Sequence, residues 1–193
     1  MSNTMAVYFS SDNHYFHANI IKYCSRPFRD VEEMNATMVG NWNSVVKDED
    51  VVFHLGDVSA GLRDRVDDFK TLIGSLKGKK ILIRGNHDHQ TDEWYVEAGF
   101  RSVHESLSIG GVLMVHYPVQ EAISRKVDDS KWGAVDHVLH GHIHRCDVQD
   151  FENHYNVAVD RNDFSPVSVE KAVPEQFRGK FLEEVKEKFI ICK

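Results

Sequence analysis

The chain has 193 residues, of which 41% are hydrophobic and 27% are charged, a balance typical of a folded protein and too apolar for a disordered one. Asp and Glu outnumber Lys and Arg by 30 to 23, giving a formal net charge of −7. Because nonspecific binding to nucleic acids depends on clustered basic residues, this charge argues against a general nucleic-acid binder. The length predicts a single domain over residues 1–193.

Targeting and redox signals are absent from the sequence. Residues 1–12 lack the basic and apolar segments of a signal peptide, and no apolar run reaches the ~20 residues of a transmembrane helix. Cys24, Cys146 and Cys192 form no C-x-x-C pair, which argues against a disulfide framework and against a cysteine-based zinc site. We therefore expect a cytoplasmic protein with no membrane partner.

Strands and helices alternate in the first half of the chain. Three apolar runs predict buried strands at residues 6–9, 51–55 and 81–83. Helical spacing of apolar residues predicts helices over 34–46 and 66–76, and Asp30 and Glu33 form a capping-box pattern before the first of them. The Met and aromatic residues of that first helix are expected in the core.

Adjacent strands dominate the second half. Apolar runs predict further strands at residues 112–115, 137–139, 155–159 and 166–169. The segment 109–112 contains two glycines and predicts a hairpin turn, and spaced apolar residues predict a terminal amphipathic helix over 177–189. The order of elements indicates an α/β fold.

Side chains that bind metals follow five of these apolar runs. They are Asp12, His14, Asp57, Asn86, His116, His142 and His144. In open α/β sheets the carboxyl ends of the strands form the ligand site, so these nitrogen and oxygen donors should converge. Two divalent ions with four protein ligands each need one contact more than seven residues offer, so one carboxylate would bridge them. Asp57 is the candidate for the bridge.

Simpler interpretations remain open for single residues. A lone histidine at a strand end is more often a hydrogen-bonded structural residue than a ligand. His17, His89 and His140 stand beside the motifs, so one of them could be the ligand in place of its neighbour. His54 lies within a predicted strand and is expected to be a core histidine.

Taken together, the five clusters resemble the calcineurin-like metallophosphoesterase family. Its motifs occur here in the family's order as Asp12-Asn13-His14, Gly56-Asp57, Gly85-Asn86-His87-Asp88, His116 and Gly141-His142-Ile143-His144. Residues 12–21 and 23–28 also resemble a small branch of the family found in phages and bacteria. The resemblance implies a two-sheet β-sandwich flanked by helices, with the site where loops leave the strand ends.

The resemblance also implies two metal sites. The first would be formed by Asp12, His14, Asp57 and His144, and the second by Asp57, Asn86, His116 and His142. Mixed imidazole and carboxylate ligands suit Mn²⁺ best, with Fe, Zn, Ni or Co as alternatives. Two ions about 3.5–4 Å apart can activate a water molecule and bind the phosphate oxygens during in-line attack.

Five further residues are candidates near these ions. His87 would lie above the metals and protonate the leaving oxygen, with Asp88 orienting its ring and favouring its charged form, unless His87 only caps the loop. Arg26 and Arg84 could bind phosphate, because guanidinium matches its oxygens, although a salt bridge explains either residue equally well. His17 could orient a ligand or touch the substrate.

The favoured function is a phosphodiesterase acting on a small or nucleotide-like ester. A phosphomonoesterase and a nucleic-acid-processing nuclease are the alternatives, and the nuclease would need a basic stripe near the site. A metal-binding scaffold without catalysis is a further alternative, but such a protein could dispense with His87 or with several ligands. The expected partner is a small phosphate ester, and the sequence leaves the oligomeric state open.

Overall fold

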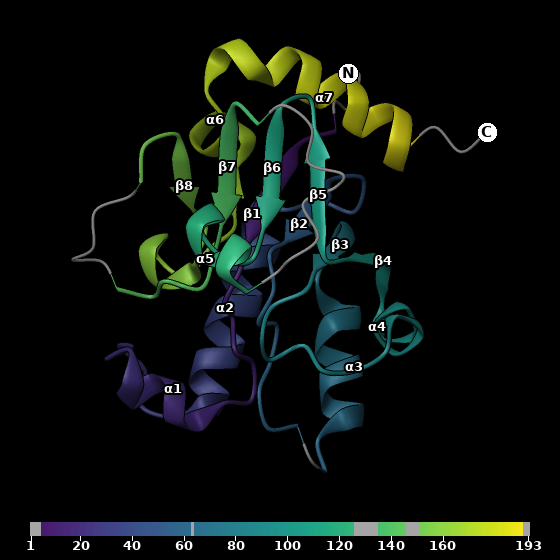
Figure 1. The fold of residues 1–193 in the computed structure, drawn as a ribbon. Coiled ribbons are helices and arrows are strands. Elements are labelled where there is room, and N and C mark those ends of the chain that lie inside the picture. Colours follow the sequence, from purple (N-terminus) through teal and green to yellow (C-terminus); the bar gives the residue numbers. More distant parts are fainter. Residues whose placement is uncertain (1–4, 63, 126–134, 146–150, 191–193) are drawn as a thin grey trace.

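Nine strands, seven α-helices and one 3₁₀ turn make up the part of the chain that the computed structural model describes, residues 5–62, 64–125, 135–145 and 151–190 (Figure 1). The strands are β1 (Val7–Ser10), β2 (Val51–His54), β3 (Lys79–Ile83), β4 (Phe100–His104), β5 (Ser106–Ile109), β6 (Val112–Val115), β7 (His137–His140), β8 (His154–Asn156) and β9 (Val167–Ser168). The helices are α1 (Ala18–Tyr23), α2 (Val31–Val45), α3 (Val66–Ser75), α4 (Asp92–Ala98), α5 (Val119–Ser124), α6 (Val169–Ala172) and α7 (Glu175–Phe189), and the 3₁₀ turn is Val159–Arg161. Cys24 is a free thiol, and the other two cysteines, Cys146 and Cys192, lie outside the described residues.

The strands form two mixed sheets. The first has the order β4-β3-β2-β1-β9, in which β1 to β4 run parallel and β9 runs antiparallel to β1. The second has the order β5-β6-β7-β8, in which β6 to β8 run parallel and β5 runs antiparallel to β6. The predicted α/β architecture of two sheets flanked by helices is confirmed.

One hydrophobic core lies between the two sheets. It combines Phe9 and Phe53 of the first sheet with Met114 and Leu139 of the second, and Phe181 of α7 packs into the same cluster. Helix α7 lies across the end of the molecule at which β6 and β7 begin (Figure 1). The site residues, which follow the ends of β6 and β7, therefore lie away from α7.

Helices cover the outer faces of both sheets. Apolar residues of α2, α3 and α4 share a second core with the outward side chains of β2 and β3. Met34, Met38 and Trp42 of α2 are buried there, so the predicted core role of this stripe is confirmed. A smaller cluster joins Leu113 and Val138 to Ala122 of α5.

Local side-chain chemistry sets where α2 begins. The Asp30 carboxylate accepts the Glu33 backbone N–H at 2.8 Å, as the capping-box pattern predicts. In a capping box the Glu33 carboxylate would accept the backbone N–H of the cap residue, Asp30. Here it accepts the N–H of Arg29, one residue earlier. Together these bonds satisfy backbone donors that a helix start leaves unpaired.

The predicted hairpin turn joins β5 to β6. Gly110 and Gly111 have positive φ angles of 57° and 87°, a conformation that most residues avoid. A Cβ atom on Gly110 would lie 2.8 Å from the backbone of Phe181, so glycine lets α7 pack directly against the turn.

The last two predicted strands differ from the structure. The segment predicted as a strand at 155–159 is strand only as far as Asn156. Beyond it, the Asn156 side chain accepts the Ala158 N–H, and the Asn162 amide donates to the carbonyls of Asn156 and Ala158. These side-chain bonds replace the strand ladder with a 3₁₀ turn. The segment predicted at 166–169 pairs with β1 at only two residues before α6 begins.

Short elements escaped the sequence analysis altogether. They are α1, α4, α5, α6, β4 and most of β5, which are too short for periodicity to separate helix from strand. Within the described ranges, no helix has the length and apolar composition needed to cross a bilayer.

Truncation of Phe181 tests the core between the sheets. The ring is fully buried against Phe9 and Phe53, with centroid distances of 5.9 and 6.2 Å. Phe181→Ala should lower the free energy of unfolding by about 3–5 kcal/mol in urea titrations, because it removes apolar contacts and leaves a cavity. The exposed neighbour Lys180→Ala should change it by less than about 0.5 kcal/mol. Equal effects of the two substitutions would contradict this core.

Candidate metal centre

All seven predicted ligands lie where the ends of the parallel strands of both sheets meet. Backbone hydrogen bonds join the loops that carry them. The Asp12 N–H donates to the Gly56 carbonyl at 2.9 Å, the His14 N–H donates to the Asp57 carbonyl at 3.1 Å, and the Gly141 N–H donates to the His116 carbonyl at 2.9 Å. These bonds join the loops in two pairs, and the bonds from His142 N–H to Asp12 and from His87 N–H to Asp57 link the pairs and the Asn86 loop.

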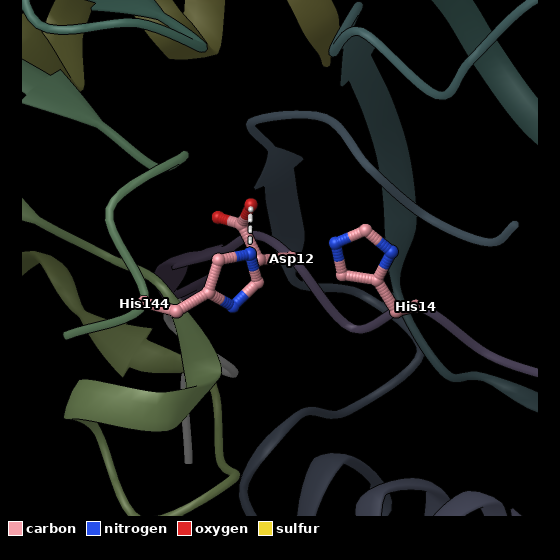
Figure 2. Close-up of side chains that lie close together, drawn as sticks. All are labelled: Asp12, His14 and His144. Carbon is pink, nitrogen blue, oxygen red and sulfur yellow. Dashed lines mark ion pairs between the residues drawn. The ribbon is translucent and has the colours of Figure 1, made fainter. Parts of the chain in front are cut away.

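The first group of predicted ligands is Asp12, His14 and His144, whose donor atoms lie within 4.8 Å of one another. Figure 2 shows the His144 ring against the Asp12 carboxylate and the His14 ring facing the pair, with His144 Nε2 3.5 Å from Asp12 Oδ1. Asp12 Oδ2 accepts the His142 backbone N–H, but Oδ1 is buried with no hydrogen-bond donor. A buried carboxylate oxygen without a donor is costly, and a metal ion would satisfy it.

The second group is Asp57, His116 and His142, again with donor atoms within 4.8 Å. His116 Nδ1 lies 2.7 Å from the Leu55 carbonyl, which can only accept, so this nitrogen carries the proton. In the neutral ring, the form that binds metal, Nε2 is then an acceptor, and it faces Asn86 Oδ1 at 3.1 Å. Because His116 Nε2 and Asn86 Oδ1 can both act as acceptors, their closeness fits a cation bound by both.

Asp57 lies between the two groups. Its Oδ2 atom is 3.5 Å from His14 Nε2, 3.6 Å from His116 Nε2 and 3.9 Å from His87 Nε2. Its Oδ1 atom accepts the His87 backbone N–H at 2.8 Å, so the carboxylate is held with Oδ2 directed at imidazoles of both groups.

The backbone around the ligands is strained. Four of the predicted ligands have left-handed φ angles, namely Asp12, His14, Asp57 and His142, at 59°, 50°, 55° and 67°. Such conformations are uncommon outside glycine and cluster at functional sites. Glycines of the motifs make room for the carboxylates: a Cβ atom on Gly85 would collide with the Asp57 carboxylate, and one on Gly141 would collide with that of Asp12.

Burial favours the neutral form of two of the predicted ligand histidines. It lowers the pKa of His14, aided by the nearby positive groups of His144 and Arg26, and it lowers the pKa of His142, aided by His116. Neutral imidazole is the form that binds metal. For His144, burial opposes the charge, but hydrogen bonding to Asp160 and the nearby Asp12 carboxylate raise the pKa to about 10.

Asp160 is a site residue that the sequence analysis missed. Its Oδ2 atom accepts a hydrogen bond from His144 Nδ1 at 2.7 Å. Asp160 directly follows the apolar run Val157–Val159, the same signal that marked Asp12 and Asp57. Glu121 of α5 was also missed, and its Oε1 lies 3.3 Å from His142 Nε2.

Among the described residues, the Asp88 carboxylate makes no hydrogen bond to His87, the residue that it is predicted to orient. Its carboxylate is buried and accepts the backbone N–H groups of Asp57, Val58 and Gly85 at 2.7, 3.1 and 2.9 Å. Burial raises the pKa of Asp88, and the nearby Asp57 adds to the effect. Asp88 thus joins two loops beside the site, since its oxygens accept from backbone donors of both loops and from the Tyr95 hydroxyl.

His87 and His17 lie at the mouth of the site. The His87 side chain is 42% exposed, and its ring centroid is 5.1 Å from that of His14. The ring of His17 lies 5.4 Å from His14 and 6.4 Å from His87, and its buried Nδ1 has no hydrogen-bond partner. Burial and the neighbouring His87 lower the pKa of His17. Both rings can reach a molecule bound above the ligands.

The other extra histidines lie apart from the ligand groups. His140 is buried, and its Nδ1 pairs with the Gly141 carbonyl while burial lowers its pKa to about 4. His54 is a core residue whose Nε2 pairs with Asn13 Oδ1, as predicted. His89 is exposed, with its ring 6.4 Å from that of His87.

Arg26 and Arg84 are engaged in salt bridges, which is the alternative left open by the sequence. Arg26 is buried and binds the Asp160 carboxylate with two nitrogens. Arg84 donates to the carbonyls of Asp88 and Gln90 and pairs with the carboxylates of Asp92 and Glu105. The donors of both guanidinium groups are thus bonded to protein acceptors.

Comparison with known proteins identifies the class. Residues 5–159 match the family model described as the calcineurin-like phosphoesterase superfamily domain. The chain therefore belongs to this superfamily of phosphoric ester hydrolases, and the resemblance in its motifs is confirmed.

Three individual proteins are similar to this chain over three quarters of its length or more. Uncharacterized protein MJ1445 of Methanocaldococcus jannaschii is 32% identical over 187 residues, which cover 93% of this chain and 96% of that protein. The Gene 66 protein of Mycobacterium phage L5 is 31% identical over 166 residues, covering 75% of this chain and 78% of its own. Among solved structures, the protein of unknown function AQ665 from Aquifex aeolicus superposes with a TM-score of 0.69 at 26% identity, covering 87% of this chain and 97% of that one.

Substitution of Asp88 tests its role beside the site. Asp88→Asn would place an amide NH₂ group against backbone N–H donors, so the free energy of unfolding should fall by about 1–3 kcal/mol in urea titrations. Asp67→Asn, an exposed acid on α3, should change it by less than about 0.5 kcal/mol. Unchanged stability of Asp88→Asn would contradict this role in joining the loops.

Proposed function

We propose that the protein is a dinuclear-metal phosphodiesterase that acts on a small or nucleotide-like ester. The observation that carries this proposal is the position of Asp57 Oδ2, which faces imidazole nitrogens of both ligand groups at 3.5 and 3.6 Å. Neither distance is a hydrogen bond, and each leaves room for a cation between carboxylate and imidazole. Because the Asp57 carboxylate faces both groups of predicted ligands, its position supports the bridging role predicted for it.

The seven ligands fit two divalent ions. Asp12, His14, Asp57 and His144 would hold the first, and Asp57, Asn86, His116 and His142 would hold the second. Their nitrogen and oxygen donors suit Mn²⁺ or another borderline ion better than Mg²⁺, which prefers oxygen ligands. When bound, the ions supply Lewis-acid stabilisation of the phosphate oxygens and lower the pKa of an attacking water.

His87 is the proposed proton donor. Its backbone N–H bond to Asp57 Oδ1 fixes the loop, while its ring stays exposed beside the ligands. In its imidazolium form, His87 would donate the Nε2 proton to the oxygen of the departing alcohol. His17 lies in the same mouth and would contact the substrate or order the His87 ring.

Charge favours a diester over a monoester. A phosphodiester carries one negative charge, whereas a monoester carries up to two near neutral pH and needs more positive charge around it. Both guanidinium groups considered as candidates for phosphate binding, Arg26 and Arg84, form ion pairs with protein carboxylates. The metal ions would then supply most of the positive charge, which suits the less charged substrate.

Metal removal tests the proposed chemistry. Chelation should abolish turnover of bis-p-nitrophenyl phosphate, and Mn²⁺ should restore it better than Mg²⁺. The value of kcat/KM should be higher for this diester than for p-nitrophenyl phosphate under the same conditions. The control is chelator already saturated with Mn²⁺, which should leave activity intact. Full turnover by metal-free protein would exclude the proposed function.

Substitution of His87 separates proton transfer from metal binding. His87→Asn should keep the metal content and lower turnover of an alkyl diester by about 10²–10⁴-fold, because an alkoxide needs a proton to leave. The loss should be much smaller for a nitrophenyl diester, whose leaving group is stable as an anion. His89→Asn, an exposed neighbour, should retain wild-type turnover on both. Equal losses of turnover on both diesters, or loss of a metal, would remove His87 from this role.

A further inference from the structure

A buried ion pair lies directly behind the first group of ligands. Arg26 follows α1, and Asp160 lies in the 3₁₀ turn after β8. Arg26 Nε is 2.8 Å from Asp160 Oδ1, and Arg26 Nη2 is 2.7 Å from Asp160 Oδ2. The side chains are 0% and 5% exposed, so water competes little for either charge.

The pair contacts two predicted ligands at once. Asp160 Oδ2 accepts His144 Nδ1 at 2.7 Å, which fixes the proton on Nδ1 and leaves Nε2 for a metal. Arg26 Nη2 donates to the Asp12 carbonyl at 2.7 Å, and Arg26 Nη1 donates to the Asn13 carbonyl at 2.9 Å. Arg26 therefore holds the strained loop that carries Asp12, while Asp160 holds the ring of His144.

These contacts direct two metal donors at one point. With its ring held through Nδ1, His144 directs Nε2 at Asp12 Oδ1, 3.5 Å away (Figure 2). That oxygen is the buried one that lacks a hydrogen-bond donor. Buried ion pairs contribute little net stability, because desolvation of the charges offsets their attraction. The orientation of Asp12 and His144 therefore explains this ion pair better than a contribution to stability does.

We propose that Asp160, coupled to Arg26, is a positioning residue for one of the two metal ions, the ion held by Asp12 and His144. The proposal rests on the ligand assignment under the proposed function. It makes a selective claim: loss of the Asp160 carboxylate weakens the Asp12–His144 site and leaves the site of His116 and His142 unchanged. A purely structural ion pair would affect both sites or neither.

Substitution in single-site backgrounds tests this selectivity. His116→Ala isolates the Asp12–His144 site, and His144→Ala isolates the other. In metal-free His116→Ala protein, adding Asp160→Asn should weaken Mn²⁺ binding by about 10–100-fold in calorimetric titrations, the range found when groups behind metal ligands are removed. In the His144→Ala background, the same substitution should change the affinity by less than about twofold.

Two further variants control the experiment. Asp163→Asn alters an exposed acid three residues away and should leave both affinities at the wild-type value, because Asn also tolerates the left-handed backbone found there. Arg26→Lys keeps the charge but loses the two-pronged contact with Asp160, and should weaken the same site selectively by a smaller factor. Circular dichroism and urea unfolding establish that each variant is folded.

The outcomes separate this inference from the proposed function. Equal weakening at both sites, or no weakening in either Asp160→Asn or Arg26→Lys, would overturn the positioning role even if the enzyme hydrolyses diesters. If Asp160→Asn fails to fold, the selectivity of Arg26→Lys decides. If wild-type protein binds one Mn²⁺ instead of two, the dinuclear function fails, and the response of that one ion to Asp160→Asn still decides the inference.

Discussion

Buried carboxylates held by the backbone N–H groups of neighbouring loops are the interaction on which the site depends. Asp12 accepts from His142, Asp57 accepts from His87, and Asp88 accepts from the loop that carries Asp57. Each bond joins loops that follow different strands, and the first of them joins the two sheets. A buried carboxylate needs such donors, so every acid that sets the ligand geometry also fixes the relative position of two loops.

Close approach of these carboxylates to the backbone explains the glycines of the motifs. Gly85 and Gly141 are placed where a side chain would collide with Asp57 and Asp12. The left-handed conformation of four ligands is a cost of order 1–3 kcal/mol for each residue, and the surrounding bonds must hold it in place. The motif therefore combines donor atoms with the small residues that let them approach.

The sequence predicted those parts of the fold and the site that are marked by one repeated local pattern, an apolar run followed by a polar cluster. Each apolar run that ends in a polar cluster is a strand. The polar clusters, from Asp12 to His144, lie together at the strand ends, as expected. The roles of Asp88, Arg26 and Arg84 could not be predicted, because they depend on which backbone groups lie opposite these side chains after folding. Asp160 carried the same local signal as Asp12 but belonged to no recognised motif.

The two sheets supply different ligands, and this division has a thermodynamic consequence. Under the proposed assignment each ion takes donors that follow strands of both sheets. Bound metals would therefore link the two sheets at the end of the molecule opposite α7. By mass action, the folded state would then gain stability as RT ln(1 + [metal]/Kd), about 1.4 kcal/mol for each tenfold rise in free metal above Kd. The resistance of this protein to heat would follow the metal supply of its surroundings as well as its sequence.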